Sequence, residues 1–347
     1  MNIEKKGEGK VRVILLMMMM VMMGCNSGGV KDPEKVFLSE MVNLGKGFLD
    51  VFVSFGDMIT GTLGIKAETK KSDIGVYFTK ISETMKATKA KLNEILENNG
   101  HYEKVREKVA AFITTIDEIE EGAKIAAGGA SGSGAIGNAV KDQAAVAANK
   151  ESVISLIKGI KAIIGIVLRD GEGSADATKT TEDDKKDIGY LFADNAGKDN
   201  AKEENIAKAA ASIGSVSGAD ILKAIAKSKE DPKADNVEGI EKATDAAEIA
   251  IAPAVANKKE IKEATAKKDA VIAAGIALRG MAKDGKFAAK NEDKSENAVN
   301  GTVASAVNKV LSTLVIAIRN TVNEGLKGIN EVLGEIKQGE GTEAKAN

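Results

Sequence analysis

The residue whose chemistry is best defined by its surroundings is Cys25, the only cysteine of the chain. Its thiol can accept a lipid, and Gly24 before it is the small residue that a signal peptidase needs to reach the bond. Four basic residues within the first twelve and an unbroken apolar run over 13–23 precede this pair. A basic N-terminal region, a short apolar segment and a small residue at the cleavage site are the parts of an export signal. We predict that the signal peptide 1–24 is removed and that Cys25 is the lipid attachment site.

A transmembrane anchor and an ordinary signal peptide are the two other interpretations of this segment. The eleven apolar residues of 13–23 would span about 16 Å as a helix. A bilayer core requires roughly 20 residues, so a transmembrane anchor is disfavoured. An ordinary signal peptide followed by an incidental cysteine stays open as the alternative. The four residues Met22–Cys25 match the lipoprotein-processing motif only loosely, because this motif usually begins with leucine and here begins with methionine.

The mature chain would begin at Cys25, with a flexible tether over 25–32 that contains Asn26–Gly29. Removal of four basic and two acidic residues lowers the net charge by two, from −2 to −4. A nearly balanced charge provides no electropositive field for nucleic acid. The partner that the sequence predicts is therefore a membrane, reached through the lipid on Cys25, and not a nucleic acid.

The remaining titratable residues do not combine into a catalytic or metal site. His101 is the only histidine, and it follows the turn-like Asn98-Asn99-Gly100, so we expect it at the surface and not in a nucleophilic triad. Zinc or iron would require a Cys/His cluster, which this composition lacks. The acidic pairs at 183–184 and 203–204 lie among lysines and are expected on a solvated face. We predict no enzymatic activity, no metal and no cofactor.

Residues 132–137, with the sequence GSGAIG, match the GxGxxG pattern of dinucleotide-binding proteins. That chemistry needs a strand before the turn and a helix after it, whose amino end receives the pyrophosphate. Here the preceding Ile119–Ala127 has helical spacing. The pattern is therefore interpreted as a flexible, glycine-rich loop.

Apolar residues recur every three or four positions over most of the chain, which predicts amphipathic helices. The two longest stripes cover 37–59 and 303–336 and predict helices at about 33–63 and 295–337, with their apolar faces in the core and not in a partner-binding groove. Further helices are predicted at 73–98, 102–126, 138–169, 186–211, 218–229, 236–263 and 266–283. The loops between them are predicted at 128–137, 170–185 and 284–297, which are glycine-rich or charged.

The predicted fold is all-α, an elongated bundle of long antiparallel helices joined by polar and glycine-rich loops. Two long stripes at the two ends of the chain would pack together, so we expect the N- and C-terminal helices to pair near the membrane. The predicted organisation is a signal peptide at 1–24, a tether at 25–32, a helical surface domain at 33–340 and a disordered tail at 341–347.

The stretch Lys267–Lys290 adds a resemblance to a known family. Its sequence, KKDAVIAAGIALRGMAKDGKFAAK, closely resembles the long invariant segment of the variable large proteins of Borrelia, which include the Vmp-like surface lipoprotein of Lyme disease spirochaetes. Further similarity lies in Phe48–Leu63, Asp73–Phe78 and Val303–Lys337. In the family-like segment, Ile272, Ile276, Leu278 and Met281 form an apolar helical face, which we predict to be buried against other helices and not to be a ligand site.

The resemblance implies a surface-exposed lipoprotein of the outer membrane, attached through lipid on Cys25, with a role in antigenic variation and evasion of host antibodies. Host antibodies are then the expected partners. The alternative is an adhesin that binds a host matrix, serum or cell-surface ligand, whose identity the sequence does not give.

Overall fold

The computed structural model describes residues 39, 42, 64–99 and 103–343. Cys25, the tether, the N-terminal stripe at 37–59 (apart from 39 and 42) and His101 lie outside these ranges, as does the predicted pairing of the terminal helices. The described part of the chain consists of helices, short 3₁₀ helices and isolated β-bridges, with no β-strand. Its helices are α3 (Lys71–Asn99), α4 (Glu103–Gly129), α5 (Lys150–Val167), α6 (Glu182–Lys185), α7 (Glu203–Ser215), α8 (Gly218–Lys227), α9 (Ala246–Ile251), α10 (Asp269–Met281) and α11 (Asp293–Glu343).

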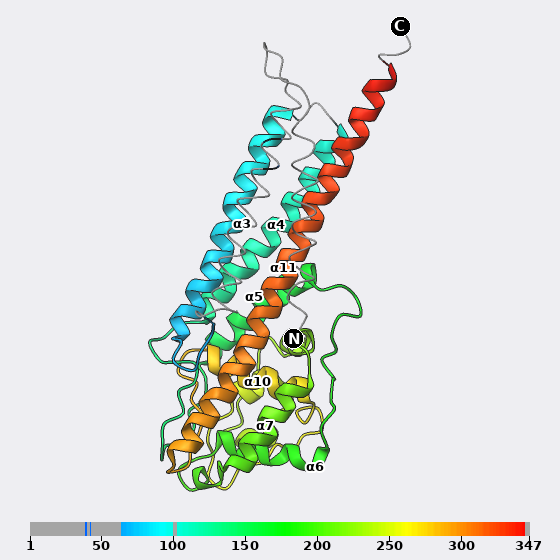
Figure 1. Ribbon diagram of the computed structural model, residues 1–347. Coiled ribbons are helices and arrows are strands. Elements are labelled where there is room, and N and C mark those ends of the chain that lie inside the picture. The colour runs from blue at the N-terminus through cyan, green and yellow to red at the C-terminus, as the bar shows by residue number, and fades with distance from the viewer. Residues whose placement is uncertain (1–38, 40–41, 43–63, 100–102, 344–347) are drawn as a thin grey trace.

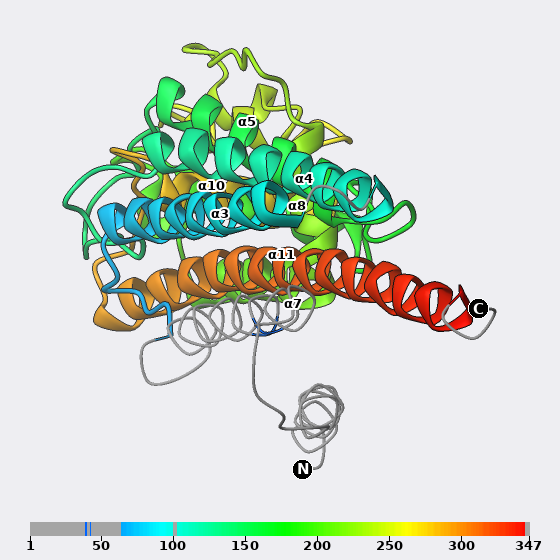
Figure 2. The same ribbon diagram turned by 90° about the horizontal axis from the view of Figure 1, so that it is seen from above.

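Long helices give the molecule its elongated shape, as the apolar stripes predicted (Figure 1). The 51 residues of α11 correspond to a length of about 75 Å. From above, α4 lies between α3 and α5 and also contacts α11 (Figure 2). The buried face of α11 includes the stripe residues Val303, Val307, Val310, Leu314, Ile318, Val322, Leu326 and Ile329. The all-α, elongated bundle is thus confirmed.

One stretch of α11, Asp293–Ile329, is long and apolar enough by composition to span a bilayer. Its apolar face is instead buried within the protein, against α10, α7, α8 and α4. The core helix of a folded domain passes the same composition test, and here that is its role. The helix ends at Glu343, so the first three residues of the predicted tail at 341–347 are helical.

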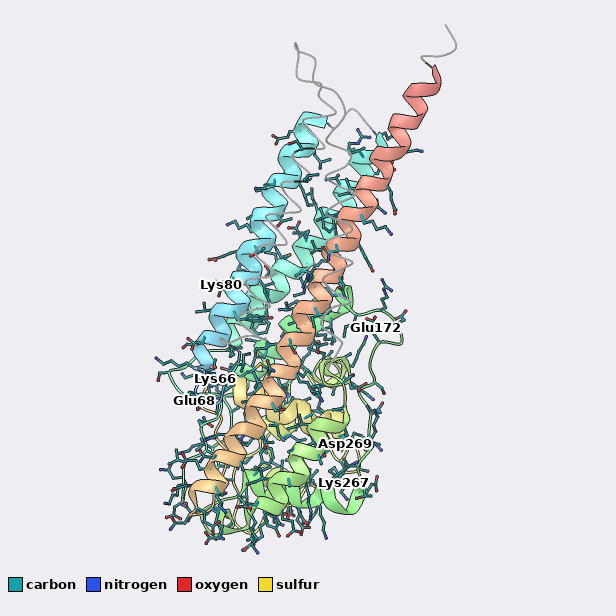
Figure 3. All side chains as sticks on the ribbon, viewed as in Figure 1. Lys66, Glu68, Lys80, Glu172, Lys267 and Asp269 are labelled. Atoms are coloured by element: carbon teal, nitrogen blue, oxygen red, sulfur yellow. The ribbon has the colours of Figure 1, made fainter. Side chains whose placement is uncertain are left out.

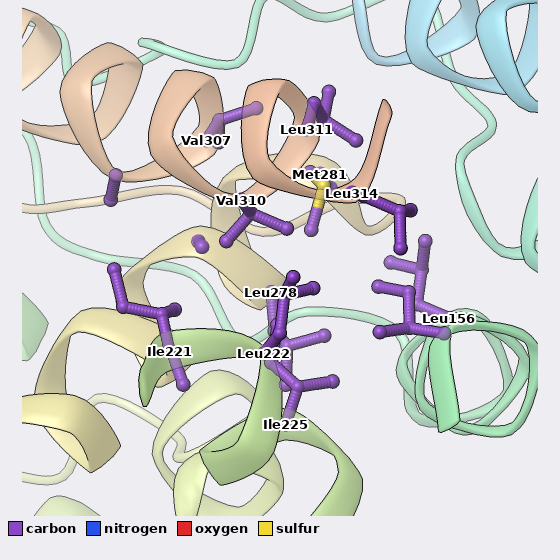
Figure 4. Packing of buried hydrophobic residues seen from close by; sticks show 14 of the residues in the cluster. Leu156, Ile221, Leu222, Ile225, Leu278, Met281, Val307, Val310, Leu311 and Leu314 are labelled. Atoms are coloured by element: carbon purple, nitrogen blue, oxygen red, sulfur yellow. The ribbon is translucent and has the colours of Figure 1, made fainter. Parts of the chain in front are cut away.

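The lower part of the molecule in Figure 1 is built around α10. This helix contacts α7, α8, α9 and α11, and all thirteen of its residues are buried. Ile272, Ile276, Leu278 and Met281 are each at most 1% exposed, so the predicted burial of this face is confirmed. Leu278 and Met281 pack among leucine, isoleucine and valine side chains of α8 and α11 (Figure 4).

Three predicted helices are wrong over part of their length. Residues 138–149 are irregular, and helix α5 begins only at Lys150, because the backbone of this segment pairs with distant segments, for example through the bridge Val146–Lys286. Residues 186–202 form the 3₁₀ helices η1 (Lys186–Phe192) and η2 (Lys198–Asn200) instead of a continuous helix.

The predicted helix at 236–263 is interrupted as well. It contains only the 3₁₀ helix η3 (Gly239–Lys242) and the six residues of α9. Pro253 follows α9 by two residues, and proline disfavours a helical conformation in the residue before it. The Asp235 side chain accepts hydrogen bonds from the backbone of Val237 and Glu238 at 2.8 Å, which favours a turn at the start of the predicted helix.

Two predicted loops are more ordered than expected. In 128–137, Ile136 is fully buried, and its N–H donates to the Thr69 carbonyl at 2.8 Å. In 284–297, Phe287 and the two alanines that follow it are buried, and α11 begins at Asp293. Both segments therefore contribute side chains to the core. Their backbone groups can lie there because they are hydrogen-bonded to other segments. The third predicted loop, 170–185, is irregular up to the short helix α6.

Candidate functional site: buried charges that position the surface loops

Helix α10 begins at Asp269, which is labelled in Figure 3. The side chain of this residue is fully buried. Its carboxylate accepts hydrogen bonds from the backbone N–H groups of Lys179 and Thr180 at 2.6 and 2.9 Å. The hydroxyls of Thr180 and Ser212 also donate to it, at 2.6 and 2.7 Å. Burial alone would raise the pKa of Asp269, but these hydrogen bonds outweigh it and lower the pKa to about 2. The carboxylate is therefore ionised at every physiological pH.

Lys185 is the basic partner of this carboxylate. Its ammonium nitrogen lies 3.5 Å from a carboxylate oxygen of Asp269, and both side chains are buried. Lys185 also donates a hydrogen bond to the Thr178 hydroxyl. A buried carboxylate costs free energy unless it is paired and hydrogen-bonded, and both conditions are met here. The cluster joins the 170–181 loop, α6 and α7 to the amino end of α10.

Arg279 lies in the last turn of α10, at its carboxyl end. The guanidinium Nη1 donates to the carbonyl oxygens of Ile249, Ala250 and Ala252, at 3.3, 3.2 and 2.9 Å. These carbonyls lie in the last turn of α9 and just beyond it, where regular helical partners run out. Ile249 and Ala250 each accept one further backbone N–H, from Ala252 and Ala148. The Nε atom donates to the Lys286 carbonyl at 3.0 Å. Full burial lowers the pKa of Arg279, yet a guanidinium stays charged at neutral pH, and it satisfies the backbone at both segments.

Two aromatic rings complete the surroundings of Arg279. Its guanidinium carbon lies 4.9 Å from the ring centroid of Phe192 and 5.8 Å from that of Phe287. The two rings meet edge to face, with centroids 5.7 Å apart. Cation–π contacts of this kind are stronger when the cation is removed from water, so the rings compensate part of the cost of burying the charge.

Lys71, at the start of α3, caps the carboxyl end of α10. Its ammonium nitrogen donates to the carbonyl oxygens of Arg279 and Gly280, at 3.1 and 2.5 Å. Burial lowers the pKa of Lys71 to about 7, with a further contribution from the nearby Arg279 charge, while Asp284 opposes the shift. The long-helix part of the molecule is thus tied to α10 through backbone atoms.

The outer surface of the loops carries a different kind of electrostatics. Ion pairs join loop residues to each other and to helices, and most of the side chains involved are exposed. They include Lys150–Asp231, Lys161–Glu230 and Lys227–Asp176, at 2.6, 2.5 and 2.7 Å. Exposed pairs of this kind contribute about 0–1 kcal/mol. The fold therefore depends little on which charges occupy this surface.

Comparison with known proteins places this arrangement in a family. A family model described as Borrelia lipoprotein matches residues 48–333. The chain belongs to the Borrelia lipoprotein family. Variable large protein 4 of Borrelia hermsii is 63% identical over 332 residues, covering 95% of this chain and 94% of the relative. Variable large protein 17 of the same organism is 56% identical and covers 95% and 93%.

A solved structure supports the fold of this Borrelia lipoprotein. The chain is similar to the Lyme disease variable surface antigen VlsE of Borrelia burgdorferi, with a TM-score of 0.70 and 35% identity, covering 85% of this chain and 97% of that chain. The resemblance that Lys267–Lys290 indicated is confirmed by these matches. That segment contains α10, which carries the buried charges Asp269 and Arg279.

The structure of this lipoprotein resolves some of the site predictions. Residues 132–137 follow helix α4, not a strand, as expected, and are held by backbone hydrogen bonds such as Lys71 N–H to Gly134 at 2.8 Å. Glu203 and Glu204 are exposed at the start of α7, which confirms the surface prediction for that pair. The pair at 183–184 lies in α6, and its side chains are outside the described set. Among the described residues, no three His, Cys, Asp or Glu side chains are grouped to hold a metal ion.

Sequence reasoning missed the four charged residues that organise the core, namely Lys71, Lys185, Asp269 and Arg279. One signal was present for Asp269 and Arg279. They are the only charged residues between Asp269 and Met281, in a stretch of otherwise apolar and glycine residues. A charged residue inside such an apolar stretch is either buried together with partners or exposed where the helix is interrupted. The first case holds here. Lys71 and Lys185 lie in polar surroundings that carry no comparable signal.

Proposed function

We propose that this lipoprotein is attached to the outer membrane through lipid on Cys25, exposed at the cell surface, and displays a switchable antigenic surface to host antibodies. The observation that carries the proposal is the set of named relatives. Variable large proteins 4 and 17 come from one organism, span more than nine-tenths of this chain, and differ from it at more than a third of the aligned positions. The name of VlsE describes it as a variable surface antigen.

The arrangement of polar groups supports this role. A display protein needs a backbone that persists while exposed side chains change. Here the charges essential to the fold are buried around α10, whereas loop residues such as Glu172 lie at the outside (Figure 3). Loops at a surface tolerate substitution better than the elements they connect. The proposed role is display and binding by antibodies, with no chemical reaction.

Membrane attachment is tested on living cells that express the wild type or Cys25→Ser. We expect labelled palmitate in the wild-type protein only, and digestion of the wild type when intact cells are treated with proteinase. The serine variant should lose the label. When cell extracts are partitioned between a detergent phase and an aqueous phase, it should move from the detergent phase to the aqueous phase. An unlabelled wild-type protein that keeps residues 1–24 would refute the lipid anchor. A labelled protein that resists proteinase on intact cells would refute surface exposure.

Antigenic display is tested with antisera raised against the purified protein and against variable large protein 4. Each serum should bind intact cells that express its own antigen, and absorption with the other protein should leave most of this binding. Complete removal of binding by the other protein would refute a variant-specific surface.

The adhesin alternative stays a prediction, because no observation on the described residues favours it. Binding of intact cells to host matrix that persists when the exposed loops are exchanged would support it.

A further inference from the structure

The side chains that hold the surface segments bind backbone groups of these segments, and Asp269 binds side-chain hydroxyls and the Lys185 ammonium as well. Six residues bind backbone groups in this way, and we refer to them as the anchor residues: Asp220, Asp269, Arg279, Glu296, Asn300 and Lys309. They come from α8, α10 and α11, and the groups they bind lie in loops or at helix ends. The contacts of Arg279 with carbonyls of 249–252 and 286 have been described. The others follow the same principle.

Three anchor residues on α11 hold two different segments. The amide of Asn300 accepts from the N–H of Ala139 at 2.8 Å and donates to its carbonyl at 3.1 Å. The carboxylate of Glu296 accepts from the N–H of Lys141 at 2.8 Å. Lys309 donates to the carbonyls of residues 213 and 216, at 2.7 and 2.6 Å, beyond the last paired turn of α7. In each case the bonded atom belongs to the backbone.

Two anchor residues hold the 170–181 loop. Asp220 accepts from the N–H of Ser174 at 2.7 Å, and Asp269 accepts from the N–H groups of Lys179 and Thr180. The N–H of Ala270, next to Asp269, donates to the carbonyl of residue 177 at 3.1 Å. The loop is therefore fixed near its start, middle and end.

Three side chains of the same loop take no part in these contacts with Asp220 and Asp269, whereas the hydroxyls of Thr178 and Thr180 do donate to Asp269. The three, those of Ser174, Asp176 and Lys179, are exposed. Asp176 pairs with Lys227, where both side chains are more than 60% exposed, so the pair contributes little to stability. Every residue except proline offers the same backbone N–H and C=O. A side chain that binds only backbone atoms consequently does not distinguish which residue it holds.

We propose that the anchor residues form a sequence-independent clamp, which keeps one backbone path for the surface loops while their exposed side chains are exchanged. The proposal rests on the proposed display function and explains how a replaceable surface is compatible with one fold. It also sets limits. Gly173 is not exchangeable, because it has φ of +77° and a Cβ would lie 2.5 Å from the Ala219 backbone. Proline is excluded at 141, 174 and 179, where the N–H donates.

The test compares loop variants with anchor variants of the purified mature protein. The loop variants are the triple S174A/D176A/K179A and the double V140T/K141Q. The anchor variants are Asp269→Asn and Asn300→Ala. Asn297→Ala, at an exposed position one turn earlier on α11, is the matched control for Asn300→Ala. Thermal unfolding and amide hydrogen exchange at residues 139, 141, 179 and 180 are measured for each.

We expect the loop variants and Asn297→Ala to keep Tm within about 2 °C of the wild type and to keep the protection of these amides. Asn300→Ala should raise exchange at 139 about tenfold, and Asp269→Asn should do so at 179 and 180. Loop variants that lose as much Tm or protection as anchor variants would overturn the clamp, as would anchor variants with unchanged protection. If Asp269→Asn does not fold, the milder Asn300→Ala decides the outcome.

These measurements use neither antibodies nor membranes. The clamp can therefore fail while variant-specific antibody binding holds, and antibody binding can fail while the clamp holds.

Discussion

Gly159 of α5 faces Gly122 of α4 so closely that a Cβ on Gly159 would lie 2.4 Å from the Gly122 carbonyl oxygen. The backbone N–H of Ala126 would lie at the same distance. A chain with little aromatic content, 3% of its residues, forms its core from small and aliphatic side chains, and close backbone approach is how such helices gain contact. The α4–α5 crossing therefore depends on the absence of a side chain at position 159.

Gly159→Ala should accordingly destabilise the protein, by about 2 kcal/mol or more, because its methyl group would meet backbone atoms that cannot move independently. Gly165→Ala on the same helix is the control. A Cβ there has no neighbour within 4 Å, so alanine should stabilise the helix by about 0.5–1 kcal/mol. Urea unfolding measures both. Equal effects of the two substitutions would show that the crossing is not as close as described.

Arg279→Met tests the buried guanidinium. Methionine retains much of the apolar stem but removes the guanidinium donor from the buried carbonyl of Ala252, while the carbonyls of Ile249 and Ala250 keep only a backbone N–H each. We expect a loss of about 3 kcal/mol or more in the free energy of unfolding. Arg106→Met, an exposed arginine paired with Glu103 at 3.7 Å, should change stability by less than about 0.5 kcal/mol. A loss below about 1 kcal/mol for Arg279→Met would mean that its hydrogen bonds are dispensable.

Lys71 predicts a pH dependence of stability. Its pKa is about 7 in the folded protein, whereas the ordinary pKa of a lysine is 10.5, so between these pH values the unfolded chain holds a proton that the folded chain has released. Stability then rises with pH over this window and is insensitive to Lys71 below it. The advantage of the wild type over Lys71→Met should grow from pH 7 to pH 10 in urea unfolding.

Lys80→Met is the control for this pH effect, because Lys80 is an exposed lysine on the same helix (Figure 3). The difference between the wild type and this control should not follow the Lys71 curve. A wild-type advantage over Lys71→Met that is constant across the window would contradict a neutral, buried Lys71.

The long helices could be predicted from sequence because their information is local. Apolar steps of three and four residues define the buried face of α11, and the predicted start at about 295 lies within two residues of Asp293. The predicted start of α3 at 73 likewise lies within two residues of Lys71. In such helices the backbone hydrogen bonds join residues that are close in sequence, so the spacing of apolar residues alone identifies the helix.

The irregular parts could not be predicted because their partners are distant. Residues 138–149 have helix-compatible composition, yet Val146 exchanges backbone hydrogen bonds with Lys286, 140 positions away. The anchors have the same character. Asp269 binds backbone atoms about 90 positions earlier, and Arg279 looks like an ordinary basic residue in the last turn of a helix. Nothing in local spacing shows which loop will come to lie against such a side chain.

Asp269 predicts the response to acid. Its pKa is about 2 in the folded protein, below the ordinary aspartate value of 3.8. Its ionised form therefore contributes stability that is complete above about pH 4 and is lost as the pH falls towards 2. Asp269→Asn cannot titrate at this position. The wild type should therefore be more stable than the variant at pH 6, and the gap should narrow between pH 4 and pH 2. Urea unfolding of both proteins, with the exposed Asp176→Asn as control, measures the gap. A gap that stays constant down to pH 2 would show that the carboxylate charge does not contribute to holding the 170–181 loop, and that the hydrogen-bond geometry alone does.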